Sequence, residues 1–135
     1  MLQPKRFKHR KAFRGKMGGV AIRGATLAFG EFGIKSLGCA WLSARQIEAA
    51  RVAISHYTKR AGRVWIRVFP DKPVTTKGLG VGMGSGKGDI DRYVAVVRPG
   101  LILFELAGVT KDVALEAMSR AGDKLPFKTK FITKE

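Results

Sequence analysis

The stretch KGLGVGMGSGKG, residues 77–88, is the first candidate for chemistry, because every second residue in it is glycine. Glycine-rich loops can hold phosphate groups, since their bare backbone N–H groups approach a ligand closely. The P-loop pattern fails here, because Val81 stands where its first glycine belongs and Gly88 where its Ser or Thr belongs. The dinucleotide pattern fails in every register, and no helix is predicted to follow the glycines and offer its N-terminus to a phosphate. We therefore expect no nucleotide and no other cofactor.

Two other roles remain open for this glycine stretch. An extended chain would place all six glycines on one side and the intervening residues on the other. The bare side could then approach another surface closely and meet phosphate or ribose oxygens with its N–H groups. Alternatively, the stretch is a loop without a single shape, because glycine loses much conformational entropy on ordering.

Residues that could act in catalysis or bind a metal are few and scattered. His56 lies on a predicted helix and nothing marks Cys39 as activated, so this pair predicts no nucleophile. His9, Cys39 and His56 are too widely spaced for a metal site. Asp89 and Asp91 are a lone carboxylate pair beside a predicted strand, where solvation or pairing with lysine explains them. We expect no catalytic residue, no metal and no enzymatic activity. A single cysteine also excludes an internal disulfide, which is typical of a reducing compartment.

The charge of the chain points to a polyanionic partner. Among 135 residues, 26 Lys and Arg stand against 10 Asp and Glu, a net charge of +16. A domain with this charge repels itself unless an anion neutralises it. Nucleic acid is the leading interpretation, and an anionic membrane surface is the alternative. We expect no membrane span, because no apolar run is long enough, and no secretory signal; an organellar transit peptide stays open.

Residues 1–24 are predicted to form a basic arm without regular structure. Phe7, His9 and Phe13 are interleaved with its cations, and no helical apolar stripe is present. We expect the arm to become ordered on its partner, where the rings can stack on RNA bases. A solvated, disordered tail is the alternative. The cations of the arm are Lys5, Arg6, Lys8, Arg10, Lys11, Arg14, Lys16 and Arg23.

The clearest predicted element is a helix over residues 43–61. Ser43 and Gln46 are spaced as a capping box, and Gly62 is expected to end the helix. Apolar residues follow one helical face at Ile47, Ala50, Ile54, Tyr57 and Ala61. The rest of the surface is cationic at Arg45, Arg51, Lys59 and Arg60.

The other predicted elements indicate one α+β domain over residues 25–135. Strands are predicted at 26–37, 63–69, 92–98, 101–106 and 127–133, partly joined by hairpins. Pro99 and Gly100 suit a type II turn between the third and fourth of these. A second helix is predicted from Thr110 to Gly122. We expect a mixed or antiparallel sheet with both helices packed on it and a glycine-rich loop at 71–90.

Seven stretches of the chain, taken together, resemble the sequence pattern of a known protein family. They are MLQPKR (1–6), FGEFGIKSL (29–37), LSARQIEAARVAI (42–54), RVWIRVFPDKPVTTK (63–77), MGSGKG (83–88), VAVVRPG (94–100) and LPFKTKFI (125–132). In this order, and over essentially the whole chain, they resemble the family of bacterial large-subunit ribosomal protein number sixteen. The combination is specific, although no single stretch would be.

The resemblance implies an α+β protein that binds large-subunit ribosomal RNA and has no enzymatic activity. It further implies a place near the site that receives aminoacyl-tRNA, with neighbouring ribosomal proteins and tRNA as partners. The cations of the arm and of the 43–61 helix, together with His9, are then expected to contact ribosomal RNA. The loop is expected to approach tRNA through Lys77, Gly82, Met83 and Lys87.

The sequence departs from the family pattern at the loop. Gly78 stands where a proline is expected, and Gly82 stands where an arginine is expected before Met83-Gly84. Tyr93 takes the place of a tryptophan. A cationic contact at residue 82 is thereby lost, so backbone groups would have to make the contacts there.

The location implied by the resemblance is a cytoplasmic ribosome, with an organellar ribosome as the alternative. A different hypothesis is a free nucleic-acid-binding protein of the architectural or chaperone kind, which would also explain the charge and the arm. Crosslinking separates the two, because a free protein would contact dispersed nucleic acids and not a single ribosomal site.

Overall fold

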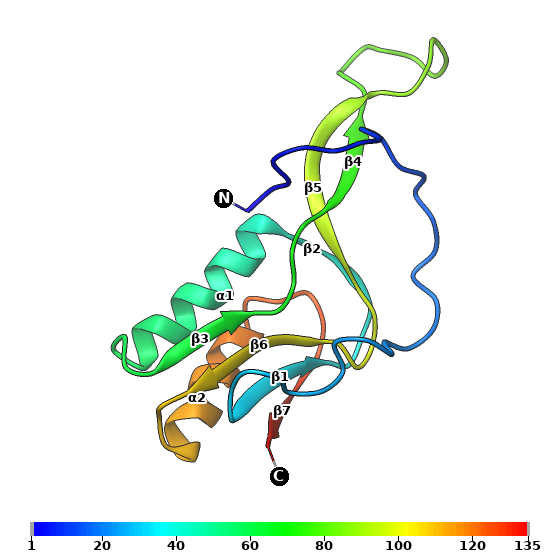
Figure 1. Cartoon of the computed structure of the whole chain (residues 1–135). Helices are drawn as coiled ribbons and strands as arrows, with labels where there is room; N and C mark the ends of the chain where they lie inside the picture. Colours follow the sequence, from blue (N-terminus) through cyan, green and yellow to red (C-terminus); the bar gives the residue numbers. More distant parts are fainter. Residues whose placement is uncertain (1, 135) are drawn as a thin grey trace.

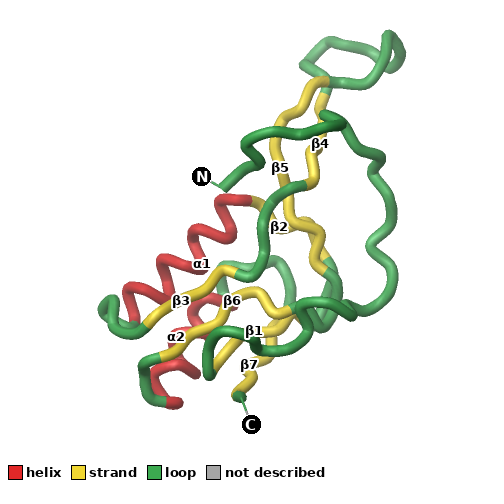
Figure 2. Tube along the Cα trace, in the orientation of Figure 1, coloured by secondary structure: helices red, strands yellow, loops and turns green. Residues whose placement is uncertain are grey.

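The computed structural model describes residues 2–134, and these form two helices and seven strands (Figures 1 and 2). In chain order they are β1 (Phe32–Ser36), β2 (Ala40–Ser43), α1 (Ala44–Tyr57), β3 (Arg63–Ile66), β4 (Lys72–Thr76), β5 (Asp89–Val97), β6 (Ile102–Ala107), α2 (Lys111–Gly122) and β7 (Thr129–Thr133). The predicted α+β class is confirmed. Met1 and Glu135, the outer bounds of the predicted arm and domain, lie outside the described residues.

The strands form two antiparallel sheets. One has the strand order β3-β6-β1-β7 and the other the order β2-β5-β4. The turn at 98–101 has type II features, because the Leu101 N–H donates to the Arg98 carbonyl at 3.3 Å and Gly100 has a φ of +94°. However, β5 and β6 belong to different sheets. The turn therefore leads from one sheet to the other and does not close a hairpin.

The segment 63–76 holds two short strands where one longer strand was predicted. β3 ends at Ile66, and β4 already begins at Lys72. Pro73 is tolerated within β4 because β4 is an edge strand, which needs ladder hydrogen bonds on one side only. β4 pairs with β5, so the irregular part of the predicted 71–90 loop is limited to residues 77–88.

Helix α1 begins as predicted and ends earlier. The Ser43 hydroxyl accepts from the Gln46 N–H, and the Gln46 side chain accepts from the Ser43 N–H. The helix stops at Tyr57 and not at residue 61, because Lys59 and Arg60 adopt left-handed φ values of 54° and 63°. Gly62 therefore lies beyond the helix. Helix α2 follows its prediction, with Thr110 as N-cap and Gly122 as last residue.

The main core lies between the two helices and one face of the four-stranded sheet (Figure 1). The central strand β6 is buried over most of its length. Fully buried side chains of this core come from both helices and from β1 and β6, and include Ile34, Ile47, Ile54, Phe104, Leu106 and Met118. Burial of each such side chain stabilises the fold by about 1.5–3 kcal/mol. The apolar face predicted for the first helix is confirmed at Ile47, Ala50 and Ile54, whereas Ala61 lies beyond α1 and is exposed.

The opposite face of the four-stranded sheet is covered by the chain just before β1. The Ile102 N–H donates to the Gly24 carbonyl at 2.8 Å, and the Glu31 N–H donates to the Leu106 carbonyl at 3.1 Å. A Cβ atom at Gly33 would lie only 2.5 Å from the Leu27 side chain. The sheet and this covering segment are thus in close contact, and a side chain at residue 33 would force the Leu27 side chain to move.

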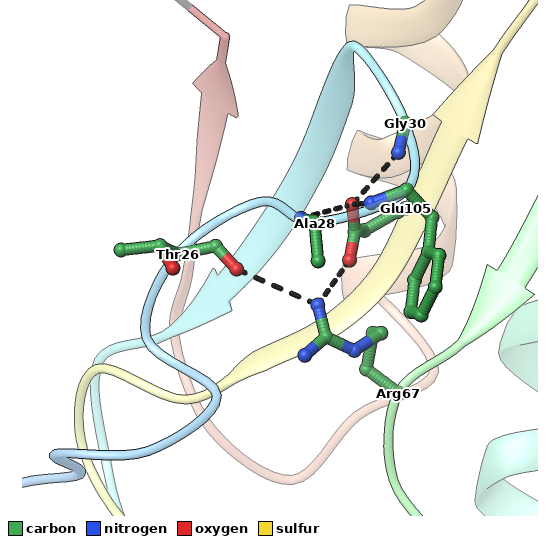
Figure 3. Close-up of polar contacts among 6 residues, drawn as sticks. Thr26, Ala28, Gly30, Arg67 and Glu105 are labelled. Carbon is green, nitrogen blue, oxygen red and sulfur yellow. Dashed lines mark hydrogen bonds and ion pairs between the residues drawn. The ribbon is translucent and has the colours of Figure 1, made fainter.

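A buried carboxylate fixes this covering segment to β6 (Figure 3). Glu105 is fully buried, and its Oε1 accepts hydrogen bonds from the N–H groups of Ala28, Phe29 and Gly30 at 3.0, 2.8 and 2.9 Å. Its Oε2 accepts a hydrogen bond from the Arg67 guanidinium. Every hydrogen-bonding partner that the carboxylate needs is therefore supplied by the chain itself.

The pKa of Glu105 reflects these partners. Burial alone would raise the pKa of this carboxyl group. The hydrogen bonds from the Gly30 N–H, from Arg67 and from the Phe29 and Ala28 N–H groups outweigh burial, and the pKa lies below its ordinary value. Glu105 is accordingly charged at neutral pH and belongs to the architecture of the fold.

Candidate nucleic-acid interface

The hairpin of β4 and β5 projects from the body of the molecule and carries the glycine stretch at its end (Figure 1). Gly80, Gly84 and Gly86 have φ values of 81°, 104° and 93°, and Ser85 has a φ of 61°. These residues are left-handed, so the glycines do not lie along one side of an extended chain, and that interpretation is wrong. The positive φ values instead explain why glycine is needed at three of these positions.

Lys77 holds the two sides of this loop together. Its Nζ donates to the carbonyl groups of Gly82, at 3.4 Å, and of Gly84. The side chain of Met83 is fully exposed between these acceptors. At Gly82 a Cβ atom would meet nothing within 4 Å, so the loop has room for a side chain at this position.

The predicted arm lies across this hairpin (Figure 1). Residues 2–31 contain no helix or strand. Phe7 stacks on Tyr93 of β5 with ring centroids 5.8 Å apart and an interplanar angle of 10°. One contact between the arm and the hairpin is therefore aromatic.

Three lysines tie the arm to the hairpin through backbone carbonyl groups. Lys11 Nζ donates to the Lys87 carbonyl at 3.3 Å, and Lys87 Nζ donates to the Ala12 carbonyl at 2.6 Å. Lys72 Nζ donates to the carbonyl of Arg14. The arm and the glycine loop, which the sequence suggested as separate features, thus form one continuous surface.

The arm reaches both faces of the three-stranded sheet. Successive residues of a strand face opposite sides, and directly paired residues face the same side. Trp41 pairs with Val96, which lies three residues from Tyr93 on β5, so Trp41 and Tyr93 face opposite sides. Phe7 contacts Tyr93, whereas the Arg14 guanidinium lies 6.0 Å from the ring centroid of Trp41. The arm therefore passes from one face to the other, beside β4 (Figure 1).

Sequence reasoning missed Trp41, Lys72 and Tyr93 as parts of this interface. The Lys72 ammonium lies 5.0 Å from the ring centroid of Trp41. Trp41 lies outside the seven stretches, Lys72 was noted only as part of the 63–77 stretch, and Tyr93 was noted only as a departure from the family pattern. The aromatic residues of the arm were the one available signal, since one of them, Phe7, stacks on a ring of the domain.

The remaining arm cations are exposed at the surface of the described structure. Lys5, Arg6, Lys8 and Arg10, together with His9, precede the lysine contacts, and Lys16 follows them. Arg23 is exposed beside the point where the Ala21 N–H donates to the Pro99 carbonyl at 2.8 Å and joins the arm to the domain.

The predicted cations of α1 are divided between its two ends. Arg45 is exposed near the start of the helix and lines the same shallow hollow as Leu2 and Tyr93. Lys59 and Arg60 lie beyond the opposite end of α1, away from the arm (Figure 1). The structure thus brings Arg45 to the arm surface and separates Lys59 and Arg60 from it.

Arg51, on the exposed side of α1, is already paired within the chain. Its Nη2 and Nε atoms donate to the two carboxylate oxygens of Glu48 at 2.5 and 3.0 Å. The hydrogen bond with Arg51 lowers the pKa of Glu48 and raises that of Arg51. Both side chains are partly exposed, so the pair adds little to stability.

Within residues 2–134, ion pairs do not neutralise the arm or the loop. The pairs found there are Arg51–Glu48, Arg67–Glu105, Arg92–Asp91 and Arg120–Glu116. None of them includes a cation of residues 2–24 or 77–88. The cations of these two segments therefore leave a positive surface for an external anion.

A second group of stacked cations and rings lies beyond the arm surface. Phe29 stacks on Trp65 at 6.0 Å, the Arg63 guanidinium lies 5.3 Å from the Trp65 ring, and Arg67 lies 5.2 Å from the Phe29 ring. Arg67 is held by Glu105, so this group belongs to the contact that fixes the covering segment.

The described residues were also compared with the requirements of a metal site and of a membrane-spanning helix. Among residues 2–134, no cluster of three or more His, Cys, Asp or Glu side chains is placed to hold a metal ion. None of the helices there is long and apolar enough to cross a membrane. Cys39 is exposed and belongs to no polar cluster.

Comparison with known proteins identifies the family. Residues 4–132 match the family described as ribosomal protein L16p/L10e. The match covers nearly all of the 135 residues, so the chain belongs to this family. It is accordingly a structural protein of the large ribosomal subunit that functions in translation, and it is not an enzyme. Membership implies ribosomal RNA and neighbouring ribosomal proteins as partners.

Proposed function

We propose that this member of the L16p/L10e family binds large-subunit ribosomal RNA through one surface made of the arm, the β4–β5 hairpin and the start of α1. The proposal takes residues 1–24 as the arm and residues 25–135 as the RNA-binding domain. The loop at 77–88 extends this surface toward tRNA in the acceptor site. Arg51 is a weaker part of the proposed contact set, because Glu48 already holds it.

The observation that carries the proposal is the concentration of cations without carboxylate partners on the arm. Eight Lys and Arg side chains lie in residues 5–23, and the first acidic residue of the chain is Glu31. The lysines that hold the arm to the hairpin donate to neutral carbonyl groups. Such contacts orient the arm and leave its positive charge uncompensated, which is the arrangement that favours a phosphate backbone.

The mechanism is neutralisation of phosphate charge together with fitting of shape. Each phosphate that the protein neutralises releases counterions and adds about 0.7–0.9 to the slope of log K against log salt. Contacts with phosphate and ribose then position the protein without reading much sequence. Binding is therefore expected to weaken steeply as salt rises.

The test compares two variants that lose the same charge in different places. Replacement of Lys5, Arg6, Lys8 and Arg10 by Gln removes four exposed arm cations that make no polar contact within residues 2–134. Replacement of Lys111, Lys124, Lys128 and Lys130 by Gln removes four exposed lysines from the region of α2 and β7. Affinity for large-subunit RNA is measured by filter binding over a series of salt concentrations.

The arm variant is expected to lower the salt slope by about 3, which is four phosphates at 0.7–0.9 each. The control variant should change the slope much less. Equal slopes for both variants would show that only total charge matters and would refute a specific arm surface.

The proposed approach of the loop to tRNA is tested separately. A photoreactive residue at position 83 exploits the full exposure of Met83. In ribosomes with a filled acceptor site, it should crosslink to tRNA, whereas the same residue at position 111 should not. Absence of a tRNA crosslink from position 83 would remove tRNA from the proposal and leave the ribosomal RNA surface untouched.

A further inference from the structure

A small hollow lies between the arm and the outer face of the three-stranded sheet. Its walls include Arg14 from the arm, Trp41 from β2, Lys72 from β4 and Lys87 from the end of the loop. Its volume is about 260 Å³. Pockets for drug-sized ligands hold about 300–1,000 Å³, so this one suits a single small planar or charged unit.

The charge of the hollow is of one sign. Three of the residues that line it are cationic, and no carboxylate is among them. None of the three takes part in an ion pair within the described chain. Lys72 and Lys87 donate there only to the neutral carbonyl groups of Arg14 and Ala12. A phosphate oxygen is a stronger acceptor for an ammonium group than a carbonyl oxygen, so an anion can compete for these donors.

Trp41 gives the hollow an aromatic wall. Lys72 and Arg14 lie 5.0 and 6.0 Å from its ring centroid, so a base that stacks on this ring must take the place of a cation there. Its buried indole N–H finds no hydrogen-bond acceptor within residues 2–134. A buried donor without an acceptor costs about 1–3 kcal/mol, so a rearrangement that gave this N–H an acceptor would be favourable.

We propose that this hollow binds one nucleotide of single-stranded RNA, with its base on the Trp41 ring and its phosphate among Lys72, Lys87 and Arg14. The assignment rests on the proposed RNA-binding function and adds one defined contact to it. An aromatic ring accepts any base by stacking, and the surrounding cations require a phosphate beside it. The arm then acts as one wall of the nucleotide site as well as a phosphate-binding segment.

Tryptophan fluorescence of the full chain tests this assignment. The chain has two tryptophans, so Trp65→Phe leaves Trp41 as the only reporter. The probe is a uridine octamer with one central adenosine. Stacking of a base should quench the Trp41 signal, and the quenching should saturate.

Three further variants in the Trp65→Phe background measure affinity for the same octamer through a fluorescent label on the RNA. Trp41→Leu should weaken binding about 5- to 150-fold, the effect of removing one base–aromatic stack. Trp41→Phe keeps a ring and should recover most of the affinity. Lys72→Met should weaken binding more than Lys111→Met, which removes the same charge from α2. Far-UV circular dichroism verifies that each variant folds.

Two results would overturn the assignment. One is an unchanged Trp41 signal at RNA concentrations that saturate the label, and the other is equal affinity of Trp41→Leu and its parent for the octamer. Binding to large-subunit RNA is measured in parallel by filter retention. If either result is obtained while Trp41→Leu still binds large-subunit RNA, the nucleotide site is refuted and the ribosomal RNA surface stands.

Discussion

Replacement of Glu105 by Gln tests how the segment before β1 is held to the sheet. The native carboxylate accepts three backbone N–H groups on Oε1 and the Arg67 guanidinium on Oε2, and it is fully buried. Glutamine has almost the same shape but offers one oxygen and one NH₂ group. In either orientation, the NH₂ group faces donors, namely the backbone N–H groups or Arg67.

The expected loss of stability in Glu105→Gln follows from these contacts. Hydrogen bonds to a charged acceptor contribute about 1.5–3 kcal/mol, and neutral ones about 0.5–1.5 kcal/mol. The three N–H bonds to Glu105 together then lose about 3 kcal/mol when the charge is removed. Removal of one partner from a buried ion pair costs about 3–5 kcal/mol. Since these effects overlap, we expect the free energy of unfolding to fall by about 3–5 kcal/mol in total.

Urea denaturation of the free protein measures this change, and the melting temperature should fall by about 10–20 °C. Glu31→Gln is the matched control, because Glu31 is exposed and lies in the same segment of chain. The control should stay within about 0.5 kcal/mol of the native protein. If Glu105→Gln were equally mild, the carboxylate would not be what holds the segment, and the reasoning would fail.

Three further outcomes are expected. The pKa of Glu105 lies below its unfolded value, so its contribution to stability is complete above the unfolded pKa and is lost as pH falls through the folded pKa. Urea midpoints measured from pH 6 to pH 2 should therefore fall less in Glu105→Gln than in the native protein. Gly82→Arg, for which the loop has room, should leave the urea midpoint unchanged and steepen the salt dependence of RNA binding by about 0.7–0.9. Gly62→Ala would place a Cβ 2.3 Å from the Ala107 carbonyl oxygen. It should lower the free energy of unfolding by more than Gly80→Ala, for which roughly 1–2 kcal/mol is expected because residue 80 has a similar φ but open space around it. Equal losses in urea denaturation would show that the backbone conformation alone decides the loss of stability.

Local patterns in the sequence predicted the parts of the fold that depend on neighbouring residues. The Ser43–Gln46 capping box and the α2 bounds from Thr110 to Gly122 follow from hydrogen bonds within a few residues of chain. The end of α1 was misjudged because Gly62 looked like a helix terminator. Its actual role is to let the chain pass close to Ala107, a residue that is distant in sequence.

Pairing between distant strands could not be predicted in the same way. Pro99 and Gly100 determine the type of turn after β5, but they carry no information about which sheet the next strand joins. That choice depends on β1 and β3, which lie far away in sequence and both pair with β6.

The candidate interface was predicted in composition but not in geometry. The arm cations were evident from the charge of residues 5–23. The contacts of Lys72 and Lys87 with the arm join side chains to backbone carbonyl groups, and every residue has such a carbonyl. No residue type or spacing could therefore mark where the arm would lie.

The position of the arm beside β4 has a consequence for the protein before it reaches a ribosome. β4 is an edge strand, and an exposed edge can pair with the edge of a second molecule and lead to aggregation. Pro73 removes one backbone donor from this strand, and Lys72 places a charge on it. The arm passes alongside and carries further positive charge. We therefore expect the same segment that is proposed to bind RNA in the subunit to hinder edge-to-edge association of the newly made chain.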